Sequence, residues 1–128
     1  MTPALPDVLR GLVASLTTPP PPESSGEFMV GRIGLVAMLL MLCAQEAEKG
    51  VAARVWENAA IRERLGDPVK AEADLTWSVL DAENAGLRTR LIAAHVEAEA
   101  RGDVDADRAF LELYAAMAKA RHLDVPGG

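Results

Sequence analysis

His95 and Glu99 stand four positions apart in a segment with helical periodicity. This spacing places an imidazole and a carboxylate on one face of a helix, where both could contact one divalent metal ion. Metal-binding helical bundles place Glu three positions before His, but Ile92 and Lys119 occupy those positions before His95 and His122. We therefore interpret His95 as a histidine paired with Glu99, and predict no metal and no cofactor.

Asp103, Asp105 and Asp107 have the alternating spacing of a calcium-binding EF-hand loop. Such a loop needs glycine at its sixth position and a bidentate glutamate at its twelfth, where this chain has Arg108 and Tyr114. Acidic residues are also common at the start of a helix, because they interact favourably with its dipole. We interpret the three aspartates in this second way.

Nucleophilic chemistry has no recognisable motif in this chain. Cys43 lies among apolar residues with no predicted base nearby, so its thiol should stay protonated. There is no glycine-rich phosphate loop. We predict that the protein is not an enzyme; the alternative is an enzyme with dispersed catalytic residues, which would need a polar cleft that converges on His95.

Residues 28–43 form the most apolar stretch of the chain, and Arg32 is its only charged residue. An arginine in such surroundings needs a carboxylate partner or a route to solvent. A structural ion pair is the ordinary explanation. The alternative is an anion anchor for the carboxylate or phosphate of a ligand.

Small and flexible residues share one face of the same stretch. Gly31 and Gly34 lie within about 60° of each other on a helical wheel, and Met38 and Met41 continue that face. Such a notch allows another backbone or a thin apolar ligand to approach closely. We favour helix packing over a ligand pocket.

The helix that positions these residues is predicted over 28–49. Ser24 and Glu27 fit a capping box at its start, and Gly50 fits a left-handed cap at its end. Because apolar residues surround this helix on all sides, it should lie at the centre of a bundle or in a membrane. The uncharged run after Arg32 covers roughly eleven residues, fewer than the ~20 of a membrane span. We predict a central helix and no membrane.

Other helices should surround this central one. A short helix opens at Pro6, and a proline-rich connector follows over 17–23. A helix over 51–65 has a weak apolar stripe, and its charged residues should be solvated. These residues are Arg54, Glu57, Arg62, Glu63 and Arg64.

One long helix is predicted over 68–101, since Asp67 and Pro68 form a start signal and apolar residues keep a regular spacing. A break at Gly86 is the alternative. Asn84 lies inside the apolar stripe and should fix register by hydrogen bonding across helices. A last helix starts near Asp105, and 124–128 form a tail. The chain is therefore predicted to be all-α: one helical domain, 1–128, with a bundle of about five helices.

Composition limits the partners. The chain carries 13 Lys and Arg against 19 Asp and Glu, a net charge of −6, which argues against nucleic acid and anionic membranes. No basic segment precedes an apolar run at the N-terminus, so we expect a cytoplasmic protein. A mean hydropathy of +0.10 is high for a small monomer and suggests apolar surface buried between subunits.

Two parts of the chain resemble one family. The first is 39–50 with the charged helix ending at 64–66, and the second is 100–105 with 117–120 and 124–126. They are similar to a small helical bacterial domain of unknown function that is encoded beside, or fused to, aminoglycoside-phosphotransferase-like proteins and acyl-CoA dehydrogenases. The resemblance implies an accessory role near acyl-CoA metabolism and supplies no catalytic residues.

These observations predict a non-catalytic helical protein that works by association, as a homo-oligomer such as a dimer and with an enzyme partner. A helical bundle that binds a small acyl-type molecule is the alternative. In that case the ligand would lie beside the notch of Gly31, Gly34, Met38 and Met41, with Arg32 as its polar anchor.

Overall fold

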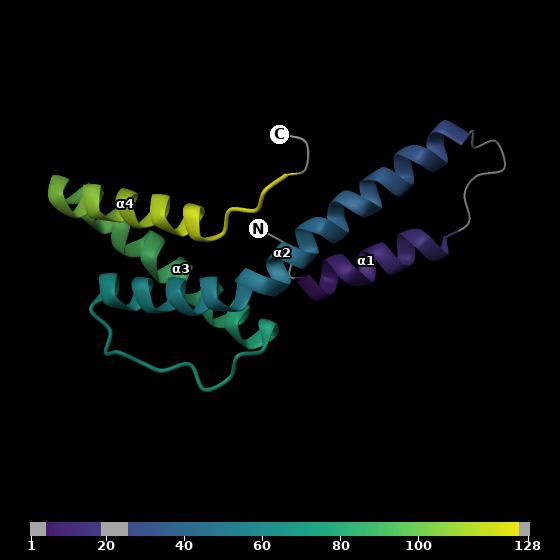
Figure 1. Cartoon of the computed structure of the whole chain (residues 1–128). Coiled ribbons are helices and arrows are strands. Elements are labelled where there is room, and N and C mark those ends of the chain that lie inside the picture. The colour runs from purple at the N-terminus through teal and green to yellow at the C-terminus, as the bar shows by residue number, and fades with distance from the viewer. Residues whose placement is uncertain (1–4, 19–25, 126–128) are drawn as a thin grey trace. The chain divides into compact units, whose positions relative to one another are not determined.

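The computed structural model describes residues 5–18 and 26–125, and every regular element in that part of the chain is a helix. The predicted all-α class is confirmed. Figure 1 shows the helices in chain order: α1 (Leu5–Thr17), α2 (Gly26–Leu65), α3 (Trp77–Ala100) and α4 (Val104–Ala120). Residues 19–25, which include Ser24 and most of the connector predicted over 17–23, lie outside the described residues, as do residues 126–128 of the predicted tail.

Four helices are described where five were predicted, because the helices predicted over 28–49 and 51–65 are one continuous helix, α2. Gly50 does not end it. Positive φ angles occur, among the described residues, only at Gly66 (76°) and Gly102 (66°). A glycine inside a helix costs only about 1 kcal/mol relative to alanine, so good helix formers on both sides carry the helix through.

The helix predicted over 68–101 begins later, at Trp77. Residues 67–76 run without helix, since ion pairs with distant arginines hold this segment: Asp67 with Arg90 at 2.7 Å and Glu72 with Arg62 at 3.0 Å. Tertiary contacts therefore override the local start signal at Pro68. The helix is unbroken at Gly86, as the main prediction held.

Contacts divide the chain into two compact units, and the single domain over 1–128 stays a prediction. Unit 1 comprises Met1–Glu48 and Leu123–Gly128, and unit 2 comprises Lys49–His122. The helix α2 contributes its first part to unit 1 and its second part to unit 2. Each unit has its own apolar cluster.

In unit 1, α1 packs against the first part of α2 through Leu12, Val36 and Cys43. Asp124 joins this unit, because its backbone N–H donates to Gln45 Oε1 and its carbonyl accepts from Gln45 Nε2, both at 2.8 Å. The predicted central position of helix 28–49 is not observed. Much of its apolar surface is exposed, including Val30, Ile33, Leu35, Leu40 and Met41.

Unit 2 buries an apolar cluster between the second part of α2 and the two C-terminal helices. The cluster consists of Ile61, Leu87, Leu91, Ala98, Phe110 and Met117. Asp103 caps α4, since its Oδ1 accepts a hydrogen bond from the Ala106 N–H at 3.0 Å. This cap explains why the helix begins at Val104, close to the predicted start near Asp105.

Candidate functional sites

A fully buried carboxylate lies at the centre of unit 2. Glu57 has no solvent-exposed surface, and both of its carboxylate oxygens accept hydrogen bonds. Oε1 accepts from Arg88 Nε at 2.6 Å and from Asn84 Nδ2 at 2.8 Å, and Oε2 accepts from Arg121 Nε at 2.7 Å. Burial by itself would raise the pKa of Glu57, but the hydrogen bonds from Arg88, Asn84 and Arg121 outweigh it and hold the pKa below its ordinary value.

The Asn84 side chain forms hydrogen bonds with Glu57, Asn58 and Arg121. Besides Glu57, its Nδ2 donates to Asn58 Oδ1 at 2.9 Å, and its Oδ1 accepts from Arg121 at 2.9 Å. These bonds connect α3 to α2 and to the residue after α4. The register role assigned to Asn84 stays a prediction, and its contacts are of the kind that such a role requires.

A second ionic cluster fixes the segment before α3. Arg62 is buried, pairs with Glu72 at 3.0 Å and also contacts Glu83, which Lys70 approaches at 3.0 Å. Arg54 is buried as well, pairs with Asp81 and stacks over the Trp77 ring. Burial would lower the pKa of Arg62, but hydrogen bonds to Glu72 and Glu83 reverse that effect and raise it.

The prediction that Arg54, Glu57 and Arg62 are solvated was therefore wrong. Their partners come from α3 and from the segments after α2 and α4, which fold back over this side of the helix. All three side chains are enclosed by protein, so none can contact a substrate in this state. We interpret both clusters as structural.

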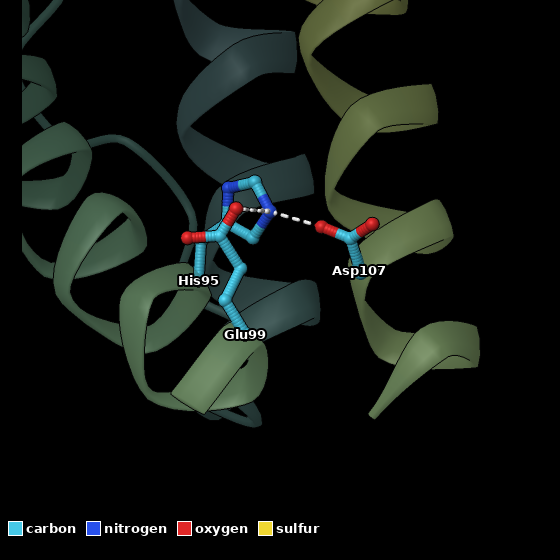
Figure 2. A group of neighbouring side chains, drawn as sticks. All are labelled: His95, Glu99 and Asp107. Atoms are coloured by element: carbon cyan, nitrogen blue, oxygen red, sulfur yellow. Dashed lines mark hydrogen bonds and ion pairs between the residues drawn. The ribbon is translucent and has the colours of Figure 1, made fainter. Parts of the chain in front are cut away.

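The His95 group brings the predicted pair of His95 and Glu99 together and adds three other residues. His95 Nε2 lies 2.7 Å from Asp107 Oδ1 on α4 and 3.9 Å from Glu99 Oε1 one helical turn away (Figure 2). On the other side of the ring, Nδ1 lies 3.2 Å from the Tyr114 hydroxyl. Phe110 stacks on the imidazole at 4.9 Å between ring centroids.

The side chains of this group differ in their exposure to solvent. The His95 side chain is 14% exposed, whereas Asp107 and Glu99 are 36% and 61% exposed. Burial raises the pKa of the Tyr114 phenol, and the charge of Glu99 adds to the effect, so this hydroxyl keeps its proton at neutral pH. The group can therefore exchange ligands or protons with solvent from its carboxylate side.

The notch of Gly31 and Gly34 opens to solvent in the described part of the chain. A Cβ atom built on either glycine meets no atom within 4 Å. Met38 is half-buried and Met41 is 52% exposed. The favoured expectation of helix packing at this notch therefore needs a partner that the described residues of one chain do not supply.

Arg32 lies beside this notch and donates from its guanidinium to the Thr18 carbonyl at 3.1 Å. It borders an open hollow of about 720 Å³ between the end of α1 and the start of α2. The hollow is lined by Ser15, Thr18, Glu27, Phe28, Gly31, Arg32 and Leu35. Its size suits a small molecule, but it is broad and shallow.

A row of exposed apolar residues follows the outer side of the same helix. Val30 is 71% exposed, Ile33 62% and Leu40 48%, and Ala37 and Ala44 complete the row. The steps of three, four, three and four residues are those of a coiled-coil contact line. We call these five residues the apolar seam.

The seam belongs to a helix that is long and apolar enough to cross a membrane by length and composition. Its most apolar stretch has a mean hydropathy of 1.9, and only 11% of that stretch is buried. A core helix of a soluble protein would be mostly buried. Something outside the described part of one chain must therefore cover this surface, or it meets water.

No protein-family model matches the chain, and no curated protein or solved structure is significantly similar to it. The resemblance to the small helical bacterial domain thus stays a prediction.

Proposed function

We propose that the protein is a helical association protein whose unit 1 pairs with unit 1 of a second copy of the chain. The apolar seam of Val30, Ile33, Ala37, Leu40 and Ala44 carries this proposal. Its residues are exposed, uncharged and spaced for contact with another helix.

The architecture of unit 1 supports a second copy as the occupant. Two packed helices leave much of their circumference uncovered, and α1 also exposes Leu9, Val13 and Leu16 at steps of four and three residues. Two such hairpins together form a four-helix bundle, in which each apolar side faces the centre. A twofold axis would present the same seam from both copies. Gly34 borders the seam and would allow the two backbones to approach closely.

A membrane is a poorer match to this surface. The run without Asp, Glu, Lys or Arg covers residues 33–45, which at 1.5 Å per residue is roughly 20 Å long. The apolar core of a bilayer is about 30 Å thick. Glu46, Glu48 and Lys49 follow directly in the same helix. The apolar run is thus shorter than the apolar core of a bilayer. A protein partner can cover such a short run without burying the charged residues that follow it.

The test is sedimentation equilibrium of the wild-type chain and of the double variant Ile33→Glu/Leu40→Glu at micromolar concentration. We expect a wild-type dimer and a monomeric variant, because the variant buries four carboxylates in each dimer interface. Ile92→Glu is the matched control, since Ile92 is 58% exposed on α3 in unit 2 and should leave the dimer intact.

Two results would contradict the proposal. One is a wild-type monomer at all concentrations; the other is a double variant that associates as tightly as the wild type. Flotation of the wild type with neutral liposomes, together with a monomer in water, would assign the seam to a membrane instead.

Gly34→Leu provides an independent check. A Cβ atom at this position meets no atom within 4 Å in the described part of one chain, and the position is exposed, so the monomer should keep its helix content by circular dichroism. Between two closely packed helices the same side chain would clash. We expect the dimer to dissociate at least about tenfold more readily, which corresponds to ~1.4 kcal/mol.

The open hollow beside Arg32 favours one second candidate, binding of an acyl-type ligand. The apolar side chains of Phe28 and Leu35 would contact the chain of a fatty acid, and Arg32 would bind its carboxylate. A fatty acid or acyl-CoA should then raise the melting temperature of the wild type, and Arg32→Gln should abolish the rise. No rise with either compound would exclude this candidate.

An enzyme partner near acyl-CoA metabolism remains the expectation that the family resemblance implies. Association with such a partner would use unit 1 surface that the dimer leaves exposed. We propose that the protein itself catalyses no reaction.

A further inference from the structure

Three metal-ligating side chains converge in unit 2. One ligand atom each from His95, Glu99 and Asp107 lies within 4.8 Å of the other two. Figure 2 shows the two carboxylates directed toward the same ring nitrogen of His95. Three donors around one Zn²⁺ ion at about 2.0–2.2 Å lie roughly 3–3.5 Å apart, so small rotations of the carboxylates would complete the set.

The imidazole ring is held in place, and a metal ion would replace the proton that Nε2 shares with Asp107 Oδ1 at 2.7 Å in the metal-free protein. A histidine that ligates through Nε2 normally donates its Nδ1–H to a second group, which fixes the ring and its tautomer. The Tyr114 hydroxyl lies 3.2 Å from Nδ1 and can accept this bond. Phe110 packs against the ring face, so the side chain loses little freedom on binding.

We propose that His95, Glu99 and Asp107 bind a divalent transition-metal ion that joins α3 to α4. One neutral imidazole and two carboxylates neutralise the charge of such an ion, and this mixed nitrogen and oxygen set suits Zn²⁺ or Co²⁺ better than Ca²⁺. Because Glu99 and Asp107 are partly exposed, the ion can enter from solvent and keep a water molecule as its fourth ligand.

The two arginines discussed here, Arg64 and Arg108, have partners outside the proposed ligand set. The Arg64 guanidinium lies over the Phe110 ring, at 4.5 Å from its centroid, and also donates to the Ala106 carbonyl at 3.4 Å. Arg108 is 4.0 Å from Asp105, an acid outside the ligand set.

The test is titration of the purified full chain with Co²⁺, followed by its visible absorption, and competition with Zn²⁺. We expect one Co²⁺ per chain, displacement by Zn²⁺ and a higher melting temperature with either ion. Glu99→Gln and Asp107→Asn should each weaken binding by more than about tenfold, and Tyr114→Phe by roughly tenfold through loss of the bond that orients His95.

Glu97→Gln and Asp105→Asn are matched controls, because both residues are exposed acids near the site but outside the ligand set. Both should bind Co²⁺ like the wild type. The proposal is overturned if no stoichiometric absorption appears, or if the two controls lose as much affinity as Glu99→Gln. Circular dichroism of each variant separates lost ligands from lost folding. Since the site lies in unit 2, its failure would leave the proposed dimer of unit 1 untouched.

Discussion

Glu57 illustrates how much of unit 2 depends on single polar atoms. Its two carboxylate oxygens receive three hydrogen bonds, two of them from guanidinium groups, in a place without solvent. A buried ion pair need not stabilise a fold more than apolar residues would, but removal of one partner leaves an uncompensated charge. Here Arg88 and Arg121 would both lose their carboxylate.

Replacement of Glu57 by glutamine should therefore destabilise the protein strongly. We expect a loss of about 3 kcal/mol or more in the free energy of unfolding, because glutamine keeps the shape but not the charge. Urea unfolding followed by tryptophan fluorescence measures it. Glu63→Gln, on the exposed side of the same helix, is the control and should change stability by less than about 0.5 kcal/mol.

The same variant tests the pH dependence. A carboxyl group whose pKa is lowered by folding contributes stability above its ordinary value of 4.5, and this contribution is lost as pH falls through the lower, folded-state pKa. The difference in stability between the wild type and Glu57→Gln should thus be largest near neutral pH and shrink in acid. A constant difference would contradict the lowered pKa.

These residues also mark a limit of prediction from sequence. Charges at Arg54, Glu57 and Arg62 repeat every three to five positions, as they do on any solvated helix face. Only the fold shows that their partners stand 10 to 64 positions further along the chain: Glu72, Asp81, Glu83, Arg88 and Arg121. His95 and Glu99 could be paired from their spacing, whereas Asp107 joined them only through the packing of α4.

At the scale of the helices, two glycines with left-handed backbone angles mark where α2 and α3 end. Gly50 and Gly86 lie inside helices, whereas Gly66 and Gly102 have positive φ and follow helix ends. Local sequence alone does not separate these two groups, and this is why two predicted helices proved to be one. The ends at Gly66 and Gly102 were predicted correctly.

Substitution of alanine at Gly66 and at Gly86 should have opposite effects. Gly86→Ala adds a methyl group in open space within α3 and should stabilise by up to about 1 kcal/mol. Gly66→Ala forces a side chain into the left-handed region and should destabilise by roughly 1–2 kcal/mol. Thermal unfolding by circular dichroism compares the two. Equal changes in both variants would contradict the assigned helix boundaries.

At the scale of the whole molecule, the two compact units differ in how much of their apolar surface is buried. Unit 2 has a buried apolar cluster and buried ion pairs, while unit 1 has a small core and a long exposed seam. Composition and periodicity predicted the all-α class because helical spacing repeats along most of the chain. They did not predict the division, since α2 continues through it as one helix.

The two units should respond differently to protein concentration. Both tryptophans, Trp56 and Trp77, lie in unit 2, so their fluorescence reports that unit alone. We expect the fluorescence midpoint in urea to be independent of concentration. The circular dichroism signal should include a second transition that moves to higher urea as concentration rises, because dimer formation stabilises unit 1. Two superimposable transitions that shift together would contradict this division.

Cys43 adds a consequence for the kinetics of unit 1. It is the only cysteine in the chain, it is buried, and it packs with Leu12 and Val36 where α1 covers α2. A thiol in this place reacts with a soluble reagent only during the moments when α1 lifts away. Its rate of alkylation therefore measures how often α1 separates from α2. A second copy bound to unit 1 should lower that rate.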